Sequence, residues 1–216
     1  MPTHRTARAI IFDLDGTLAD TFPLIVRAWN VALTPVTGKT YSDEEVIARF
    51  GIPDGQMIVR ELAGRPAGEA VDAYHACYER EHAAIVRPFE GIESLLGELQ
   101  RRRVPIGVMT GKGRGTADIT LRQLGWDHTF AAVITGDDVA GQKPAPDGPL
   151  AAAKKLGAAP ADCAFVGDSP ADIGAGRSAG MISVAAAWHP VFVEALRALA
   201  PDLWAERPAD VLKVLG

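Results

Sequence analysis

Two aspartates, Asp13 and Asp15, end an apolar run and lead into a glycine turn in the stretch IIFDLDGTLADT. Residues two apart on an extended chain point to the same side, so both carboxylates can face one ligand. Gly16 lets the chain turn sharply without a side chain in the way. The pair is therefore a candidate functional site. Alone, it could equally be a surface turn.

A second acidic pair, Asp168 and Asp172, follows another apolar run in GDSPADI. Like charges about 4 Å apart repel by roughly 4 kcal/mol at an effective dielectric near 20, so four converging carboxylates need a cation or raised pKa values. Oxygen ligands of this kind suit Mg²⁺, whereas no histidine and cysteine set in the sequence indicates zinc. Asp172 also fits the third helical position after a capping Ser169, so a structural role is equally open to it.

Groups that can hold an anion follow two further apolar runs. Thr110 and Gly111 open the turn TGKGRG, where a hydroxyl and backbone N–H groups can bind anionic oxygens at a helix N-terminus. Lys143 lies in GQKPAPDG, whose prolines stiffen the loop, and its ammonium can neutralise nearby carboxylates or a bound phosphate. We expect Lys112 to be solvated and His189 to lie in a surface turn.

Five apolar runs rich in Val, Ile and Phe must position these side chains. Helical patterns separate the last four, and an alternation of strands and helices predicts an α/β fold with a doubly wound parallel sheet. Ligands bind beyond the carboxyl ends of such strands, where the polar residues above collect. The runs span residues 8–13, 104–110, 130–136, 163–168 and 181–188.

The first two runs are about 90 residues apart, which is too far for a single crossover helix. The intervening segment has helical periodicity and no evident strand. We therefore expect an α/β catalytic core made of residues 1–20 and 88–216, and a small all-helical insert made of residues 21–87.

Composition limits the remaining possibilities. A net charge of −5 argues against a general role on nucleic acid or on a membrane surface. No apolar run reaches transmembrane length. Cys77 and Cys163 are 86 positions apart and indicate reduced packing residues rather than a metal pair or disulfide framework. We expect a cytoplasmic protein that is a monomer or homodimer.

The stretches DLDGTLADT, VMTGK, GQKPAPDG and GDSPADI together resemble the four motifs of the haloacid dehalogenase (HAD) superfamily, in the order of that family. The helical insert resembles the C1 cap of its members. The whole pattern is similar to phosphoglycolate phosphatases and to their pyrophosphatase and β-phosphoglucomutase relatives. The resemblance implies a HAD-type Rossmann-like core and a Mg²⁺-dependent phosphatase, with a small phosphorylated metabolite as its partner.

The resemblance also implies a role for each matching residue. Asp13 would be the nucleophile that forms an aspartyl-phosphate, and Asp15 the general acid and then the general base. Mg²⁺ would be held by Asp13, by the backbone carbonyl of Asp15 and by Asp168, with support from Asp172. The phosphoryl group would be bound by Thr110, Gly111 and Lys143.

Several alternatives remain beside a phosphatase for a small phosphomonoester such as phosphoglycolate. An inorganic pyrophosphatase or a phosphomutase of the β-phosphoglucomutase type would have the same core, and Phe22, Arg49, Phe50 and Gly51 are the insert residues expected to decide between them. A dehalogenase has no use for Asp15, and a phosphonate hydrolase is expected to lack it. A non-enzymatic phosphate-binding regulator fits poorly with a complete catalytic set.

Overall fold

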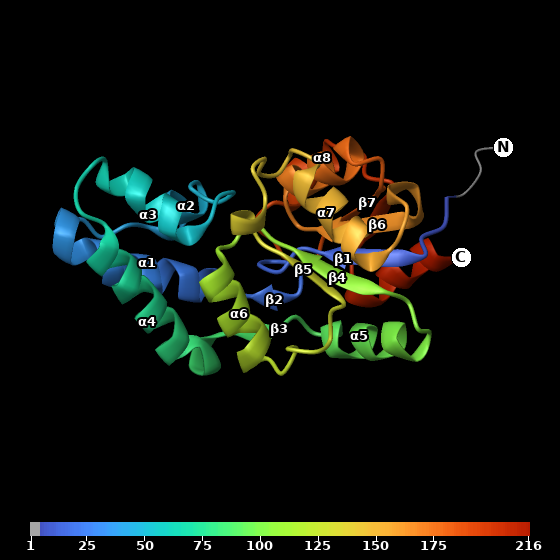
Figure 1. The fold of residues 1–216 in the computed structure, drawn as a ribbon, viewed down its shortest axis with the longest axis horizontal. Coiled ribbons are helices and arrows are strands. Elements are labelled where there is room, and N and C mark those ends of the chain that lie inside the picture. Colours follow the sequence, from blue (N-terminus) through green and yellow to red (C-terminus); the bar gives the residue numbers. More distant parts are fainter. Residues whose placement is uncertain (1–4) are drawn as a thin grey trace.

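The computed structural model describes residues 5–216, and a six-stranded parallel sheet lies at its centre (Figure 1). The strand order is β5-β4-β1-β6-β7-β8, so β1 lies between β4 and β6. The strands are β1 (Ala9–Phe12), β4 (Ile106–Met109), β5 (Ala132–Ile134), β6 (Cys163–Gly167), β7 (Ile182–Ala186) and β8 (Leu203–Ala205). The first five correspond to the five predicted runs. The edge strand β8 was not predicted, because three residues carry too little pattern.

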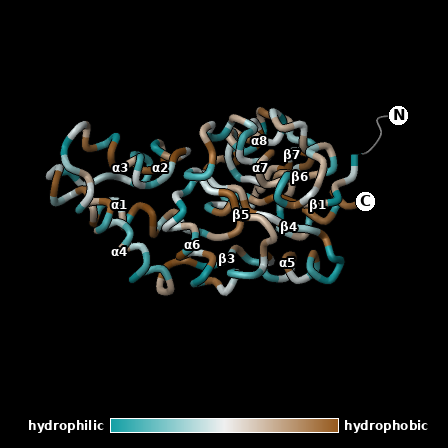
Figure 2. The backbone as a smooth tube through the Cα atoms, in the orientation of Figure 1, coloured by the Kyte–Doolittle hydropathy of each residue, from teal (hydrophilic) through white to brown (hydrophobic). Residues whose placement is uncertain are grey.

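Helices cover both faces of this sheet, which confirms the predicted doubly wound α/β class. One face packs against α5 (Ile92–Arg101), α6 (Arg114–Gln123) and the 3₁₀ helix η3 (Pro208–Leu215). The other packs against α7 (Asp147–Leu156) and α8 (Pro170–Ser178). The strands of the sheet are accordingly apolar along their length in Figure 2. The remaining short elements are α9 (Val193–Arg197), η1 (Gly136–Asp138) and η2 (Pro160–Asp162).

Four helices lie between two short strands that leave and rejoin the sheet domain (Figure 1). The strands β2 (Ala19–Asp20) and β3 (Arg87–Pro88) form an antiparallel two-stranded ribbon, which the sequence did not predict. The helices are α1 (Phe22–Thr37), α2 (Asp43–Ile47), α3 (Asp54–Leu62) and α4 (Gly68–Ile85). They share a hydrophobic cluster of their own around the fully buried Trp29, Tyr74 and Tyr78.

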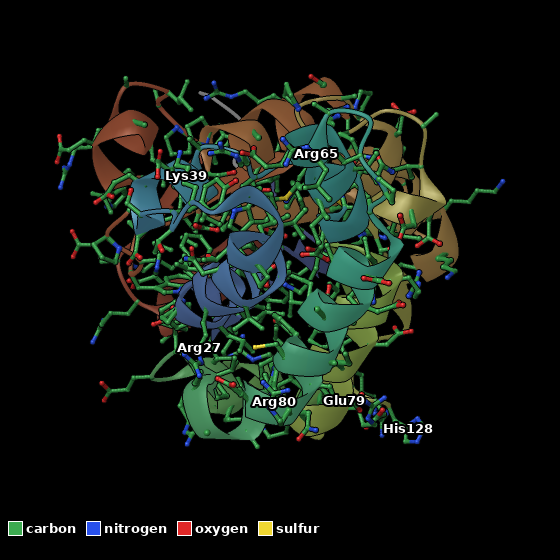
Figure 3. All side chains as sticks on the ribbon, turned by 90° about the vertical axis from the view of Figure 1, so that its left-hand side faces the viewer. Arg27, Lys39, Arg65, Glu79, Arg80 and His128 are labelled. Carbon is green, nitrogen blue, oxygen red and sulfur yellow. The ribbon has the colours of Figure 1, made fainter. Side chains whose placement is uncertain are left out.

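The outer surface of this helical group is charged. Figure 3 looks onto it and shows Arg27, Lys39, Arg65 and Arg80 at the periphery. Arg27 is paired with Glu81 across α1 and α4. Exposed pairs of this kind contribute little to stability, so burial of the aromatic cluster is the main cohesive term. Within residues 5–216, no helix combines the length and apolarity needed to cross a membrane.

The helical group meets the sheet domain where α4 packs on α6. The hydroxyl of Tyr78 lies 3.0 Å from Oγ1 of Thr120, and Nε2 of His82 lies 3.2 Å from the same oxygen. All three side chains are fully buried. Burial, with a contribution from the nearby Lys112, lowers the pKa of His82 to about 4.

This buried histidine makes the stability of the protein depend on pH. In the unfolded chain His82 takes up a proton near pH 6.5, whereas in the folded chain it does so only near pH 4. The free energy of unfolding therefore decreases as the pH is lowered from about 6.5 to about 4. We expect the free energy of unfolding to fall there by up to about 3 kcal/mol more in the wild type than in His82→Gln. Denaturant unfolding between pH 4 and 7 measures the difference. The exposed His128→Gln is the matched control, and parallel curves for wild type and His82→Gln would contradict the assignment.

Candidate active site

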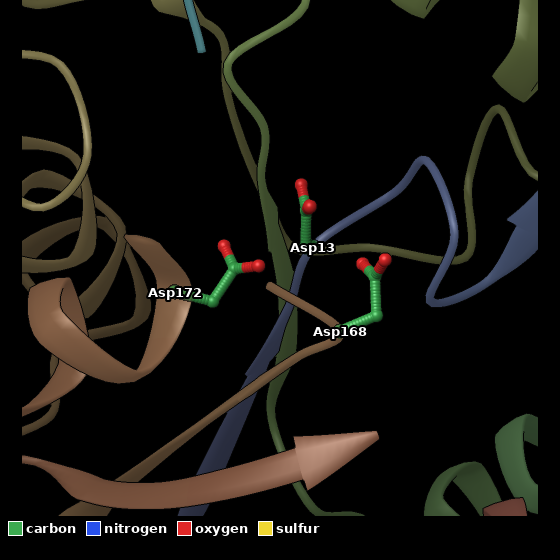
Figure 4. Close-up of side chains that lie close together, drawn as sticks. All are labelled: Asp13, Asp168 and Asp172. Carbon is green, nitrogen blue, oxygen red and sulfur yellow. The ribbon is translucent and has the colours of Figure 1, made fainter. Parts of the chain in front are cut away.

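Three aspartates meet at the carboxyl edge of the sheet (Figure 4). Asp13 follows β1, Asp168 follows β6, and Asp172 lies in the first turn of α8. One oxygen of each lies within 4.8 Å of the others. They converge because β1 and β6 are parallel neighbours and therefore end at the same edge.

These carboxylates are almost completely buried, and their charges oppose one another. Burial is the main reason that the pKa of Asp13 rises to about 7, and Asp172 and Asp15 add to the effect. The pKa of Asp168 is raised for the same main reason, with contributions from Asp172 and Asp13. Oδ2 of Asp168 accepts no hydrogen bond from the described residues. A buried acidic cluster with an orphaned oxygen suits a hard divalent cation such as Mg²⁺, so the donor set fits the metal that the sequence implied.

Lys143 provides fixed positive charge beside this cluster. Its Nζ lies 3.0 Å from Oδ1 of Asp13 and 2.6 Å from Oδ1 of Asp172. Burial acts to lower the pKa of Lys143, but the two carboxylates outweigh it and raise the pKa above its usual range. The ammonium is therefore charged, and it can neutralise both the acidic cluster and a bound anion.

Asp172 has the capping role that the sequence left open, and it also contacts Lys143. Its carboxylate accepts hydrogen bonds from the backbone N–H and the hydroxyl of Ser169, which forms the capping box of α8. The same carboxylate pairs with Lys143. One residue thus caps a helix and fixes the position of the lysine.

The turn after Asp13 is shaped to admit Asp168. Gly16 has a φ of +78°, and a Cβ at this position would lie 2.4 Å from Oδ2 of Asp168. Only glycine fits both constraints. Oγ1 of Thr17 donates to Oδ1 of Asp168 at 2.9 Å, which holds that carboxylate toward Asp13.

The carboxylate of Asp15 lies outside the three-carboxylate cluster. Its Oδ1 accepts hydrogen bonds from Oγ1 of Thr21 at 2.6 Å and from Nζ of Lys112 at 3.1 Å. The prediction that Lys112 is solvated is wrong, because α4 places the ring of Tyr78 4.5 Å from its ammonium and buries it. Burial acts to lower the pKa of Lys112, but Asp15 and Tyr78 outweigh it and raise the pKa. This lysine holds the second aspartate in place.

A cavity of about 360 Å³ opens over these groups, between the sheet domain and the helical group. Thr110 is buried, and its Oγ1 accepts a hydrogen bond from the backbone N–H of Lys112 at 3.1 Å. The hydroxyl proton is not used in this contact, so it can be donated to a bound anion. The predicted site residues that line the cavity are Asp13, Asp15, Thr110, Gly111, Lys143 and Asp168. Asp172 lies behind them, in contact with Lys143.

His189 is buried, so the prediction of a surface turn is wrong. Its ring lies edge-on to Phe22 and Phe89, with centroids 4.5 Å and 5.5 Å away. Its Nδ1 is 3.8 Å from Oδ2 of Asp168. Burial lowers its pKa, so it is a neutral neighbour of the acidic cluster.

Asp54 is a buried site residue that the sequence did not indicate. It begins α3 and lines the cavity, and its carboxylate accepts hydrogen bonds from the hydroxyl of Tyr74 at 3.0 Å and from the backbone N–H of Gly113 at 3.1 Å. Thr116 donates to it as well. The only sequence signal is an aspartate after a proline, which is typical of any helix start. Asp54 fixes the helical group against the N-terminus of α6.

The structure thus combines a parallel α/β sheet, an aspartate pair after its central strand, a buried acidic cluster and a paired lysine, which is the arrangement that the four motifs implied. A profile described as haloacid dehalogenase-like hydrolase matches residues 10–186. The chain belongs to the haloacid dehalogenase-like hydrolase family, as the motifs predicted.

Curated relatives and solved structures agree with this assignment. The chain is 31% identical over 214 residues to pyrophosphatase PpaX of Bacillus velezensis, with 99% of each chain covered. It is 34% identical over 186 residues to a phosphoglycolate phosphatase of Xylella fastidiosa, with 84% of this chain and 80% of the relative covered. The crystal structure of a hydrolase from Pseudomonas syringae matches with a TM-score of 0.79 and 29% identity, covering 95% of this chain and 96% of the other.

Proposed function

We propose that this hydrolase is a Mg²⁺-dependent phosphatase that cleaves a small phosphomonoester through an aspartyl-phosphate on Asp13. The observation that carries the proposal is the convergence of Asp13, Asp168 and Asp172, with the charged Lys143 within 3.0 Å of Asp13. A phosphoryl group brings negative charge to a nucleophile that is itself negative. Only a site with fixed positive charge can bring the two together.

The residues divide the reaction between them. Oδ of Asp13 attacks phosphorus, the P–O bond to the leaving group breaks, and Asp15 gives its proton to the departing oxygen. Asp15 then takes a proton from water, which attacks phosphorus and releases Asp13 and phosphate. Thr110 and Lys143 orient the phosphoryl oxygens. Mg²⁺ held by Asp13, Asp168 and the carbonyl of Asp15, with Asp172 behind them, would neutralise charge that develops on these oxygens.

We assign residues 21–87 to a cap that excludes water from this reaction, and residues 1–20 and 88–216 to the catalytic core. In the part of the chain that the structure describes, the chain enters the cap through β2 and leaves it through β3. These two strands pair as a ribbon, which suits a hinge. Asp54 and Tyr78 hold the cap on α6 in the arrangement seen here.

A phosphomutase remains the second candidate, because three of the four residues expected to decide between the two activities, Phe22, Phe50 and Gly51, line the cavity. The fourth, Arg49, does not. The two activities differ in the acceptor, which is water for a phosphatase and a sugar hydroxyl for a mutase. A phosphatase releases one phosphate for each ester consumed. The names of the relatives make phosphoglycolate and pyrophosphate the first substrates to assay beside sugar phosphates.

Metal removal tests the proposal. We expect EDTA to reduce phosphate release to about a tenth or less, and added Mg²⁺ to restore it, because the buried carboxylates otherwise repel the substrate. Zinc chelation alone should leave the rate unchanged, which distinguishes the two metals. Unchanged phosphate release after exhaustive EDTA treatment would contradict a metal-dependent reaction.

A further inference from the structure

Apart from Asp54, the residues that the helical group contributes to the cavity wall are apolar. Phe192 adds to this apolar wall from the sheet domain. Phe22 and Phe50 meet edge-on with ring centroids 5.0 Å apart. The apolar residues that the helical group and its connecting segments contribute to this wall include Phe22, Ile25, Ile47, Phe50, Ile52 and Met57. A leaving group in the cavity therefore contacts hydrocarbon and aromatic rings.

Positive charge is absent from this apolar wall. Of the described residues that line the cavity, only Lys112 and Lys143 are cationic. The side chain of Lys112 is 1% exposed and paired with Asp15, and that of Lys143 is 6% exposed and paired with Asp13 and Asp172. Both belong to the reacting end of the cavity, so neither meets a second anionic group on the leaving group.

The arginine of the helical group that adjoins the cavity wall in sequence is directed elsewhere. Arg49 precedes two residues of the cavity wall, but its Nε is 2.7 Å from Oε2 of Glu61. Its guanidinium lies 5.4 Å from the ring centroid of Tyr41 and 5.9 Å from that of Trp29. These contacts are inside the helical group. Arg49 thus supports the fold of that group and does not line the cavity.

A helix N-terminus could also receive an anion, but carboxylates already occupy that of α6, which is one of the helices that begin beside the cavity. At the start of α6, the N–H of Gly113 donates to Asp54 at 3.1 Å, and the N–H of Arg114 donates to Asp137 at 2.8 Å. Asp54 is itself part of the lining. A carboxylate or phosphate on the leaving group would meet this negative charge and an apolar wall, which is an unfavourable place for an anion.

We propose that the substrate is a phosphomonoester with an uncharged, apolar or aromatic leaving group, bound by the wall of Phe22, Phe50 and Met57. This inference rests on the proposed phosphatase function and narrows it. It predicts that phosphoglycolate and pyrophosphate, the substrates in the names of the relatives, are poorer substrates than phosphate esters of similar size with an uncharged leaving group. The wall selects the leaving group by burying its apolar surface and by leaving a second anion without a partner.

Matched ester pairs test this substrate class. Benzyl phosphate and 4-carboxybenzyl phosphate differ by one remote carboxylate, and propyl phosphate is the neutral counterpart of phosphoglycolate. With Mg²⁺ present, we expect kcat/KM of each ester with an uncharged leaving group to exceed that of its carboxylate-bearing partner by at least about tenfold. Pyrophosphate should be a poorer substrate still. Equal or faster turnover of the charged partners would overturn the inference alone. Phosphate release from none of these compounds would overturn the phosphatase function as well.

A charge placed in the wall provides a second, independent readout. Ile47→Arg adds a guanidinium at a half-buried position of the wall, and we expect it to shift the ratio of kcat/KM toward 4-carboxybenzyl phosphate by about tenfold. Val59→Arg is the matched control, because Val59 is 54% exposed and lies outside the cavity. We expect that variant to keep the wild-type ratio. An identical ratio in a folded Ile47→Arg protein would contradict the placement of the leaving group.

Discussion

Asp13→Asn is expected to reduce phosphate release by about 10⁴-fold or more, because an amide cannot form the aspartyl-phosphate. The substitution keeps the size of the side chain and leaves Asp168, Asp172 and Lys143 in place. Steady-state phosphate release with excess ester measures the loss. Binding of inorganic phosphate should persist, since Thr110 and Lys143 are unchanged.

A fold defect would also abolish activity, so stability must be measured beside it. The raised pKa of Asp13, about 7, means that its charge destabilises the metal-free fold as pH rises from about 4 through 7. Removing that charge should therefore leave the melting temperature of the metal-free protein at pH 7 unchanged or higher. The exposed Asp118→Asn, in α6, is the control for the exchange of aspartate for asparagine. Turnover near the wild-type rate in Asp13→Asn would rule out the covalent mechanism.

Asp15→Asn is expected to lower turnover of alkyl phosphates by roughly 10²–10⁴-fold, the usual contribution of a general acid and base. The size of the loss should depend on the leaving group. p-Nitrophenolate departs without a proton, so formation of the aspartyl-phosphate from p-nitrophenyl phosphate should be affected much less than its hydrolysis. The enzyme should then accumulate in the phosphorylated form.

A rapid-mixing assay of Asp15→Asn separates these steps. We expect a burst of about one p-nitrophenol per enzyme, followed by slow steady-state release of p-nitrophenol. The acid-quenched enzyme should carry a phosphoryl group, detected as an increase in its mass or as a phosphate label that hydroxylamine removes. The same assay on Asp118→Asn should show wild-type kinetics. Equal losses on p-nitrophenyl and alkyl esters, without a burst, would mean that Asp15 does not transfer protons to the leaving group.

The core of the site could be predicted because parallel strands impose a simple geometry. Each predicted strand ends in polar residues, and strand ends share one edge of the sheet. Asp13 and Asp168 therefore meet, although they are 155 positions apart in the sequence. Local rules were equally sufficient for the capping box of Ser169 and Asp172. These inferences needed only the pattern of the residues and the order of the runs.

Burial in the contact between the cap and the core could not be predicted in the same way. Lys112 lies in a glycine-rich turn and has the sequence context of a solvated residue, yet Tyr78 from another part of the chain covers it. Asp54 has an ordinary helix start as its context, yet it caps α6 across the same contact. His189 is enclosed by Phe22, at the beginning of the helical insert, and by Phe89, just after its end.

The amino-acid sequence by itself determined the α/β class, the helical insert and the set of aspartates, threonine and lysine that we propose transfers a phosphoryl group. Periodicity, caps and strand ends are properties of neighbouring residues, so they can be read along the chain. Tertiary structure alone decided which charges remain free to meet a substrate, because burial and pairing depend on residues distant in sequence. It showed that both lysines of the cavity are already paired and that its far wall is apolar.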